Sequence, residues 1–169
     1  LQRLVGQLIT GQPVSVAVVG GSISAGATYT TLRGSKASWL WHRLFFDWVN
    51  ASFPHRDNSH FNGALPASTP GYVESCVTLH VPLAADLVFV EYAANFDNER
   101  AYERLLRRLL RYERQPAIVL LNMPYFFGTG LNRNIDPDLP TTARDLNFSF
   151  HDTMAAENSI TLLAQHYGV

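Results

Sequence analysis

Apolar residues along the chain form short continuous runs separated by stretches with a helical period. Val14 to Val19 is a valine-rich run closed by two glycines, which is typical of a strand buried on both faces. Asp86 to Ala93 and Ala117 to Asn122 are runs of the same kind, and His60 to Leu65 is a short segment that precedes Pro66. The pattern therefore predicts four strands, which we number one to four by these ranges: 14–19, 60–65, 86–93 and 117–122.

Helical patterns lie between the predicted strands. Ser38 to Asn50 predicts a helix whose packed face carries Trp41, Leu44, Phe45 and Trp48. Pro70 opens a second helical stretch that extends to His80, because proline is favoured in the first helical turn. Glu99 to Arg114 has the clearest amphipathic pattern, with apolar residues on one side and arginines on the other. Thr141 to Tyr167 is predicted to be mostly helical, with a core face of Ile160, Leu163 and Ala164.

Strands and helices alternate along the whole chain, which indicates a parallel sheet with helices on both faces. Right-handed crossovers then give a three-layer, doubly wound α/β fold of the flavodoxin-like kind, with strand order 2-1-3-4. Ligands bind beyond the carboxyl ends of the strands in such sheets. The residues that follow those ends are 20–26, 66–68, 94–97 and 124 onward.

Composition and charge exclude several classes of protein but do not indicate one activity. The 169 residues are 47% hydrophobic and 16% charged, which fits one globular domain and excludes disordered, collagen-like and coiled-coil chains. The net charge of -1 supplies no basic field, so nucleic acid is not an expected partner. The apolar runs are too short to span a membrane. A single cysteine, Cys76, leaves the cellular compartment open, and no metal-ligand spacing or cofactor motif is present.

The turn after strand one carries the first chemical candidate. Its sequence, Gly20 to Gly26, allows a sharp turn that leaves the hydroxyl of Ser22 at the crevice. The residues fit neither a dinucleotide-binding turn nor a phosphate loop, and the α/β-hydrolase elbow needs glycine where Ser24 stands. Ser22 is therefore a candidate nucleophile, while a turn that only connects a strand to a helix explains the same residues equally well.

Asn95 is the second candidate, at the end of strand three. Its amide can donate a hydrogen bond to an oxygen in the same crevice. An isolated asparagine in a turn usually has only a local role, so the argument rests on co-occurrence. Ser22, Asn95 and the polar turn Asn62 to Thr69 follow three different strands of the predicted sheet.

Three blocks of this chain resemble those of the SGNH (GDSL-type) hydrolases. The first is Gly20 to Gly26, with Gly21 where many members have aspartate; the second is Asn62 to Ser68 and the third is Val90 to Asn95. The blocks stand in family order between residues 20 and 95. The sequence Glu-Tyr-Ala-x-Asn in the third block is most similar to that of a group with plant and algal members.

The resemblance implies roles for three residues. Ser22 would be the nucleophile and would give one backbone donor of the oxyanion hole, and Asn95 would be the side-chain donor. The second backbone donor falls on Ala67, where the family usually has glycine. We expect the methyl group of Ala67 to crowd the hole and to exclude the φ that glycine tolerates. Phe96 stands where an aspartate commonly follows the third-block asparagine.

The resemblance also implies a general base from an Asp-x-x-His after a fifth strand. We expect both beyond Val169, so that residues 1–169 would form one SGNH-hydrolase-like domain that is incomplete at its C-terminus. The same spacing occurs at Asp57 to His60, which precedes strand two and is therefore expected at the sheet edge opposite Ser22. His80 precedes strand three.

The two remaining candidate bases are also unsuited to activating a serine at the carboxyl edge. His166 ends a helix that returns to the amino edge of the sheet. His151 is expected on the surface after strand four, and Asp152 could not orient it, because adjacent helix residues face different ways.

These observations predict a serine-dependent hydrolase of small-molecule or carbohydrate esters, an acetyl esterase among them, with an acyl-Ser22 intermediate and no cofactor. A non-catalytic binding or structural domain that keeps the same fold is the alternative, and Ala67 and Phe96 favour it mildly. The sequence leaves the acyl group, the alcohol, the compartment and the oligomeric state open.

Overall fold

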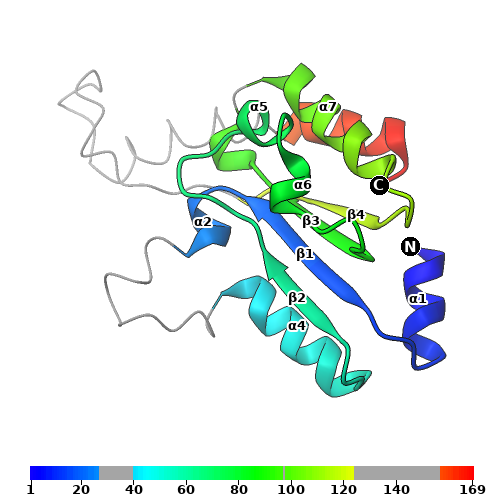
Figure 1. Cartoon of the computed structure of the whole chain (residues 1–169). Coiled ribbons are helices and arrows are strands. Elements are labelled where there is room, and N and C mark those ends of the chain that lie inside the picture. The colour runs from blue at the N-terminus through cyan, green and yellow to red at the C-terminus, as the bar shows by residue number, and fades with distance from the viewer. Residues whose placement is uncertain (27–39, 97, 124–156) are drawn as a thin grey trace.

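The computed structural model describes residues 1–26, 40–96, 98–123 and 157–169. Its centre is an all-parallel sheet of β2 (Ser59–Asn62), β1 (Ser15–Gly20), β3 (Leu87–Glu91) and β4 (Ala117–Leu121), in that spatial order (Figure 1). The predicted order 2-1-3-4 and the α/β class are thus confirmed; β1 is shifted by one residue from its predicted range, and the other three strands are one to three residues shorter than predicted.

Helices flank the sheet. They are α1 (Gln2–Ile9), α2 (Ser22–Ala25), α4 (Trp41–Ser52), α5 (Pro70–Val73), α6 (Val77–His80), the 3₁₀ turn η2 (Ala93–Asn95), α7 (Glu99–Leu110) and a last helix over residues 157–167. The stretch that the sequence predicted from Pro70 to His80 is thus two short helices. The helix α1 was not predicted, and residues 141–156 of the predicted last helix lie outside the described residues.

Each face of the sheet has its own apolar core. On one face, Val88, Val90 and Tyr92 pack with α5, α6, α7 and the last helix, to which Ile160 and Leu163 contribute as predicted. On the other face, Val16 and Val18 pack with α1 and α4. Residues that alternate along β1 and β3 therefore serve opposite cores, which explains why both strands are continuously apolar.

The packed face predicted for α4 is partly wrong. Its buried residues are His42, Phe46 and Val49, whereas Leu44 and Trp48 are 54% and 59% exposed. Trp41 and Phe45 are half-buried and pack edge-on against Phe89, with ring centroids 5.2 and 5.0 Å apart. The helix is therefore rotated so that a histidine lies on its inner side, where it has polar partners described below.

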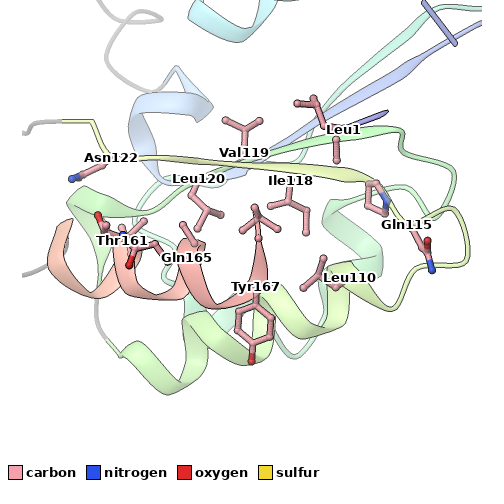
Figure 2. Close-up of a pocket in the computed structure, with 16 residues that line it drawn as sticks. Leu1, Leu110, Gln115, Ile118, Val119, Leu120, Asn122, Thr161, Gln165 and Tyr167 are labelled. Carbon is pink, nitrogen blue, oxygen red and sulfur yellow. The ribbon is translucent and has the colours of Figure 1, made fainter. Parts of the chain in front are cut away.

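Strand β4 forms the far edge of the sheet, and among the described residues it pairs only with β3. An open groove of about 930 Å³ runs along it, lined by β4, residues 115–116 and the last helix. Figure 2 shows Ile118 and Leu120 on the strand and Tyr167 on the helix at this groove. None of Ser22, Ala67 and Asn95 lines it.

Candidate active site

The Ser22 turn begins where β1 ends. The N–H of Gly21 donates to the carbonyl of Glu91 on β3 at 3.1 Å, and α2 starts at Ser22. Gly26 ends the turn with a φ of 77°, and a side chain there would collide with Leu40. The conformation therefore favours glycine at position 26, and a side chain there would require Leu40 to move.

Asn95 lies directly against the Ser22 turn. It ends η2, four residues after the last residue of β3, and its carboxamide packs so closely on Gly21 that a Cβ at position 21 would overlap Oδ1. This contact explains why glycine stands at position 21, because any side chain there would collide with Asn95. The two candidate residues therefore meet at the carboxyl edge of β1 and β3.

Ala67 is attached to the same edge through the second segment. The N–H of Leu65 donates to the carbonyl of Gly20 at 3.0 Å, and the buried Ser68 hydroxyl donates to that carbonyl at 3.1 Å. Between them Ala67 adopts a φ of 57°. The expectation that alanine excludes this conformation is therefore wrong: the hydrogen bonds on either side hold a left-handed backbone that costs an alanine about 1–2 kcal/mol.

Three hydrogen-bond donors at this edge lack an acceptor among the described residues. They are the backbone N–H of Ser22, the backbone N–H of Ala67 and the side-chain amide of Asn95. All three residues are partly or fully accessible to solvent. A substrate oxygen at this edge could accept hydrogen bonds from such donors, and donors that converge on one oxygen stabilise an oxyanion.

A buried polar network lies beneath the turn, centred on Ser24. Its N–H and its hydroxyl both donate to Oε2 of Glu91, at 3.3 and 3.0 Å, and Trp41 Nε1 donates to the hydroxyl at 3.3 Å. Ser24 and Glu91 are completely buried. Burial raises the pKa of Glu91, against which the hydrogen bonds from Ser24 act only in part.

Two histidines extend this network toward β2. His42 Nε2 lies 2.9 Å from the carbonyl of Ser24, to which it must donate, and Asn62 Nδ2 donates to that carbonyl at 3.1 Å. His42 Nδ1 is then an acceptor for Nε2 of His60, 2.9 Å away. Burial lowers the pKa of His42, and burial together with the neighbouring His42 lowers the pKa of His60 to about 4. Both rings are therefore neutral at neutral pH.

No histidine of the described residues hydrogen-bonds to Ser22. His60, which pairs beside Val16 in the amino half of β1, stacks on His42, while the carboxylate of Asp57 lies 3.9 Å from His55 and 3.6 Å from Arg56. The Asp57 to His60 pattern is therefore not an Asp-His pair.

The other histidines do not change this result. His80 hydrogen-bonds to the carbonyl of Gly63 at 3.1 Å, and His166 packs edge-on against Tyr167 on the last helix. The predicted surface position of His151 lies outside the described residues.

The sequence analysis missed His42, Ser24 and Glu91 as parts of the site. Glu91 could have been noticed as the one ionisable residue within the apolar strand β3. His42 gave no comparable signal, because a histidine beside aromatic residues fits an exposed helix face equally well. Among the described residues, no cluster of His, Cys, Asp and Glu suits a metal ion, and no helix is long and apolar enough to cross a membrane.

Comparison with known proteins identifies the fold. No protein-family model matches the chain, and no curated protein sequence matches it, but solved structures do. A two-domain esterase active on acetylated mannans, co-crystallised with mannopentaose, has a TM-score of 0.67 and 18% identity over 98% of this chain and 39% of that chain. Another structure of a two-domain esterase active on acetylated mannans has a TM-score of 0.65 and 18% identity, over 90% and 52%.

A mutant of the esterase AlinE4 is the third similar structure, with a TM-score of 0.54 and 15% identity over 94% of this chain and 74% of that chain. The chain thus spans 39% to 52% of the length of the two-domain esterases. These likenesses, together with the sheet order 2-1-3-4, show that the chain shares the α/β fold of these esterase structures.

Proposed function

We propose that this chain is the nucleophile-bearing part of a serine ester hydrolase that removes acetyl or similar short acyl groups, with carbohydrate esters as the substrate class. The observation that carries the proposal is a set of three donors at one sheet edge that have no acceptor in the part of the chain that the structure describes: the N–H groups of Ser22 and Ala67 and the amide of Asn95. The esterase activity of the structures with a similar fold, two of them active on acetylated mannans, adds support for the reaction and for the substrate class.

The chemistry has two halves. A general base takes the proton of the Ser22 hydroxyl as Oγ attacks the ester carbonyl carbon, and the negative oxygen of the tetrahedral intermediate accepts from Ser22, Ala67 and Asn95. The C–O bond to the alcohol breaks, and the base returns its proton to the leaving alcohol. Water then attacks the acyl-Ser22 ester in the same way and releases the carboxylic acid.

The base belongs to the proposal as well. Since no described histidine bonds to Ser22, we place the base outside the described residues, in an Asp-x-x-His that follows Val169. Activity of the full-length protein that exceeds that of residues 1–169 by orders of magnitude would support this placement. Equal, Ser22-dependent activity of the two would instead place the base within residues 1–169, with His151 as the first to be replaced.

Hydrolysis of an activated acetate ester and of acetylated mannan by the full-length protein tests the function. Ser22→Ala is expected to lower kcat by about 10³-fold or more, whereas Ser52→Ala, at the exposed end of α4, leaves it unchanged. Asn95→Ala is expected to lower kcat by about 10²–10³-fold with little change in KM. A folded protein without Ser22-dependent turnover would favour the alternative, a binding domain of the same fold.

A further inference from the structure

Glu91 is an unexpected residue for its place in the fold. The strand β3 is buried throughout, and its other four residues are apolar, yet its last residue is a glutamate with no solvent exposure. Oε2 accepts two hydrogen bonds, whereas Oε1 has no partner among the described residues. Burying such a group costs free energy that a leucine of similar size would not cost. Packing and stability alone therefore do not explain a carboxyl group here.

The bonds of Glu91 go to residues on both sides of Ser22. Its main-chain carbonyl accepts from the N–H of Gly21, the residue before Ser22. Its side chain accepts from the N–H and the hydroxyl of Ser24, two residues after Ser22. One residue thus fastens the turn at both ends, while Ser22 itself bonds to no described side chain.

The pairing of β1 with β3 also fixes the start of the Ser22 turn. Gly20 and Glu91 are register partners in the β1–β3 ladder, and a Cβ on Gly20 would lie 2.6 Å from the carbonyl oxygen of Glu91. The same strand continues into η2, which ends at Asn95. The short segment from Glu91 to Asn95 therefore contacts the Ser22 turn at one end and carries Asn95 at the other, so it sets the distance between the two.

We propose that Glu91 is a positioning residue for Ser22: its carboxyl group locks Ser24 and so holds the α2 turn, and with it the Ser22 hydroxyl, at a fixed place relative to Asn95. The inference rests on the proposed function, since it assigns Glu91 to the reaction of Ser22. Misplacement of a reacting group by about 1 Å can cost 10²-fold in rate, so a small shift of this turn has a large effect.

The hydrogen bonds around Ser24 require an acceptor at position 91. Trp41 donates to the Ser24 hydroxyl, which in turn donates to Glu91. The hydrogen bonds of these three groups therefore all point toward Glu91. His42 and Asn62 hold the carbonyl of Ser24 from the opposite side. Only an acceptor at position 91 can complete these hydrogen bonds, and glutamine supplies one whereas leucine does not.

The test compares Glu91→Leu with Glu91→Gln in the full-length protein. Glu91→Leu is expected to lower kcat by about 10–100-fold with KM within about threefold of wild type, because the binding groups remain while the nucleophile is misplaced. Glu91→Gln is expected to restore kcat to within about threefold of wild type, because its amide oxygen still accepts from Ser24. Each variant is checked for folding by its melting temperature.

Glu74 offers a matched control. It is also buried, at 8% exposure, and binds Arg104 and Arg108 of α7 at 2.9 and 3.4 Å, away from the Ser22 turn. Glu74→Leu is expected to lower the melting temperature and leave kcat unchanged. This control separates loss of a buried carboxylate in general from loss of the lock on Ser24.

The outcomes are distinct. If Glu91→Leu does not fold, Ser24→Ala takes its place, with kcat about 3–10-fold lower as the expected result, since it removes the hydroxyl and keeps the N–H. Ser22-dependent turnover that is unchanged in the folded Glu91→Leu or Ser24→Ala protein overturns the inference and leaves the proposed function intact. Absence of any Ser22-dependent turnover in the wild type overturns the proposed function, and the inference with it.

Discussion

The backbone at Ala67 is held in a conformation that alanine avoids. Its φ of 57° places the residue in the left-handed region, next to the buried Ser68 whose hydroxyl binds the carbonyls of Gly20 and Leu65. These bonds tie the segment to the end of β1. The strain is therefore carried by the same contacts that bring the N–H of Ala67 to the site.

Replacing Ala67 by glycine should relieve this strain. The variant loses about 1–2 kcal/mol of strain in the folded state, and its unfolded state gains about 0.4–1 kcal/mol from extra backbone freedom. Ala67→Gly is therefore expected to be more stable than wild type by roughly 0.5–1 kcal/mol. Ala84→Gly, at an exposed turn without positive φ, should be less stable than wild type. Urea unfolding of both variants measures the difference, and destabilisation of Ala67→Gly would contradict the strain.

The position of a single residue in the sheet can be predicted where one sequence signal is sufficient. Ser22 and Asn95 follow valine-rich strands, and because parallel strands end at one edge of a sheet, their meeting could be foreseen. The conformation of Ala67 could not, since it depends on hydrogen bonds to Gly20 from elsewhere in the sequence. The role of His42 depends in the same way on Ser24 and His60.

At the scale of elements, Asp86 joins α1 to the sheet at the edge opposite the site. It is 1% exposed; Oδ1 binds Arg3 at 2.8 Å and Arg114 at 3.3 Å, and Oδ2 accepts from the N–H of Ser15 at 2.9 Å. One carboxylate thus connects α1, the start of β1 and the turn before β4. Both arginines are partly exposed, so they can regain water if the carboxylate is lost.

Asp86→Ala is expected to lower the free energy of unfolding by about 2–3 kcal/mol, because the N–H of Ser15 loses its acceptor and two cations lose their partner. Hydrogen exchange should also become faster in α1. Asp47→Ala, which removes an exposed pair with Arg43, should cost no more than about 1 kcal/mol. Equal losses in the two variants would show that Asp86 does not anchor α1.

Elements were predictable to the extent that apolar burial decides them. The pattern of α7 predicted an apolar side of Tyr102, Leu105, Leu106, Leu109 and Leu110; the first four are buried and Leu110 is half-buried. The rotation of α4 was missed because the polar contacts of His42 turn a histidine inward and leave Trp48 outside. The helix α1 was missed because its eight residues bury only Leu4.

For the whole molecule, the paired histidines predict how stability depends on pH. The pKa of His60 is lowered from 6.5 to about 4 in the folded protein, so between these values the unfolded chain binds more protons than the folded one. Stability therefore rises with pH across that window and is lost as pH falls from about 6.5 toward 4.

His60→Gln tests this dependence, since glutamine can still donate to His42 but does not titrate. The free energy of unfolding should decrease less in the variant than in wild type between roughly pH 7 and pH 4, because this range covers both pKa values of His60. His166→Gln, at an exposed position of the last helix, should leave the pH dependence unchanged. A pH dependence of His60→Gln that equals that of wild type would rule out His60 as its source.

The central claim is that Ser22 is the nucleophile of an acyl transfer, and covalent labelling tests it most directly. The full-length protein would be treated with a fluorophosphonate, which phosphonylates an activated serine with loss of fluoride, and the modified residue located by mass spectrometry of its peptides. The account predicts one adduct, on Ser22, that is absent from Ser22→Ala and forms at least tenfold more slowly in Asn95→Ala. An adduct on another serine, or none on a folded protein that hydrolyses acetyl esters, would contradict it.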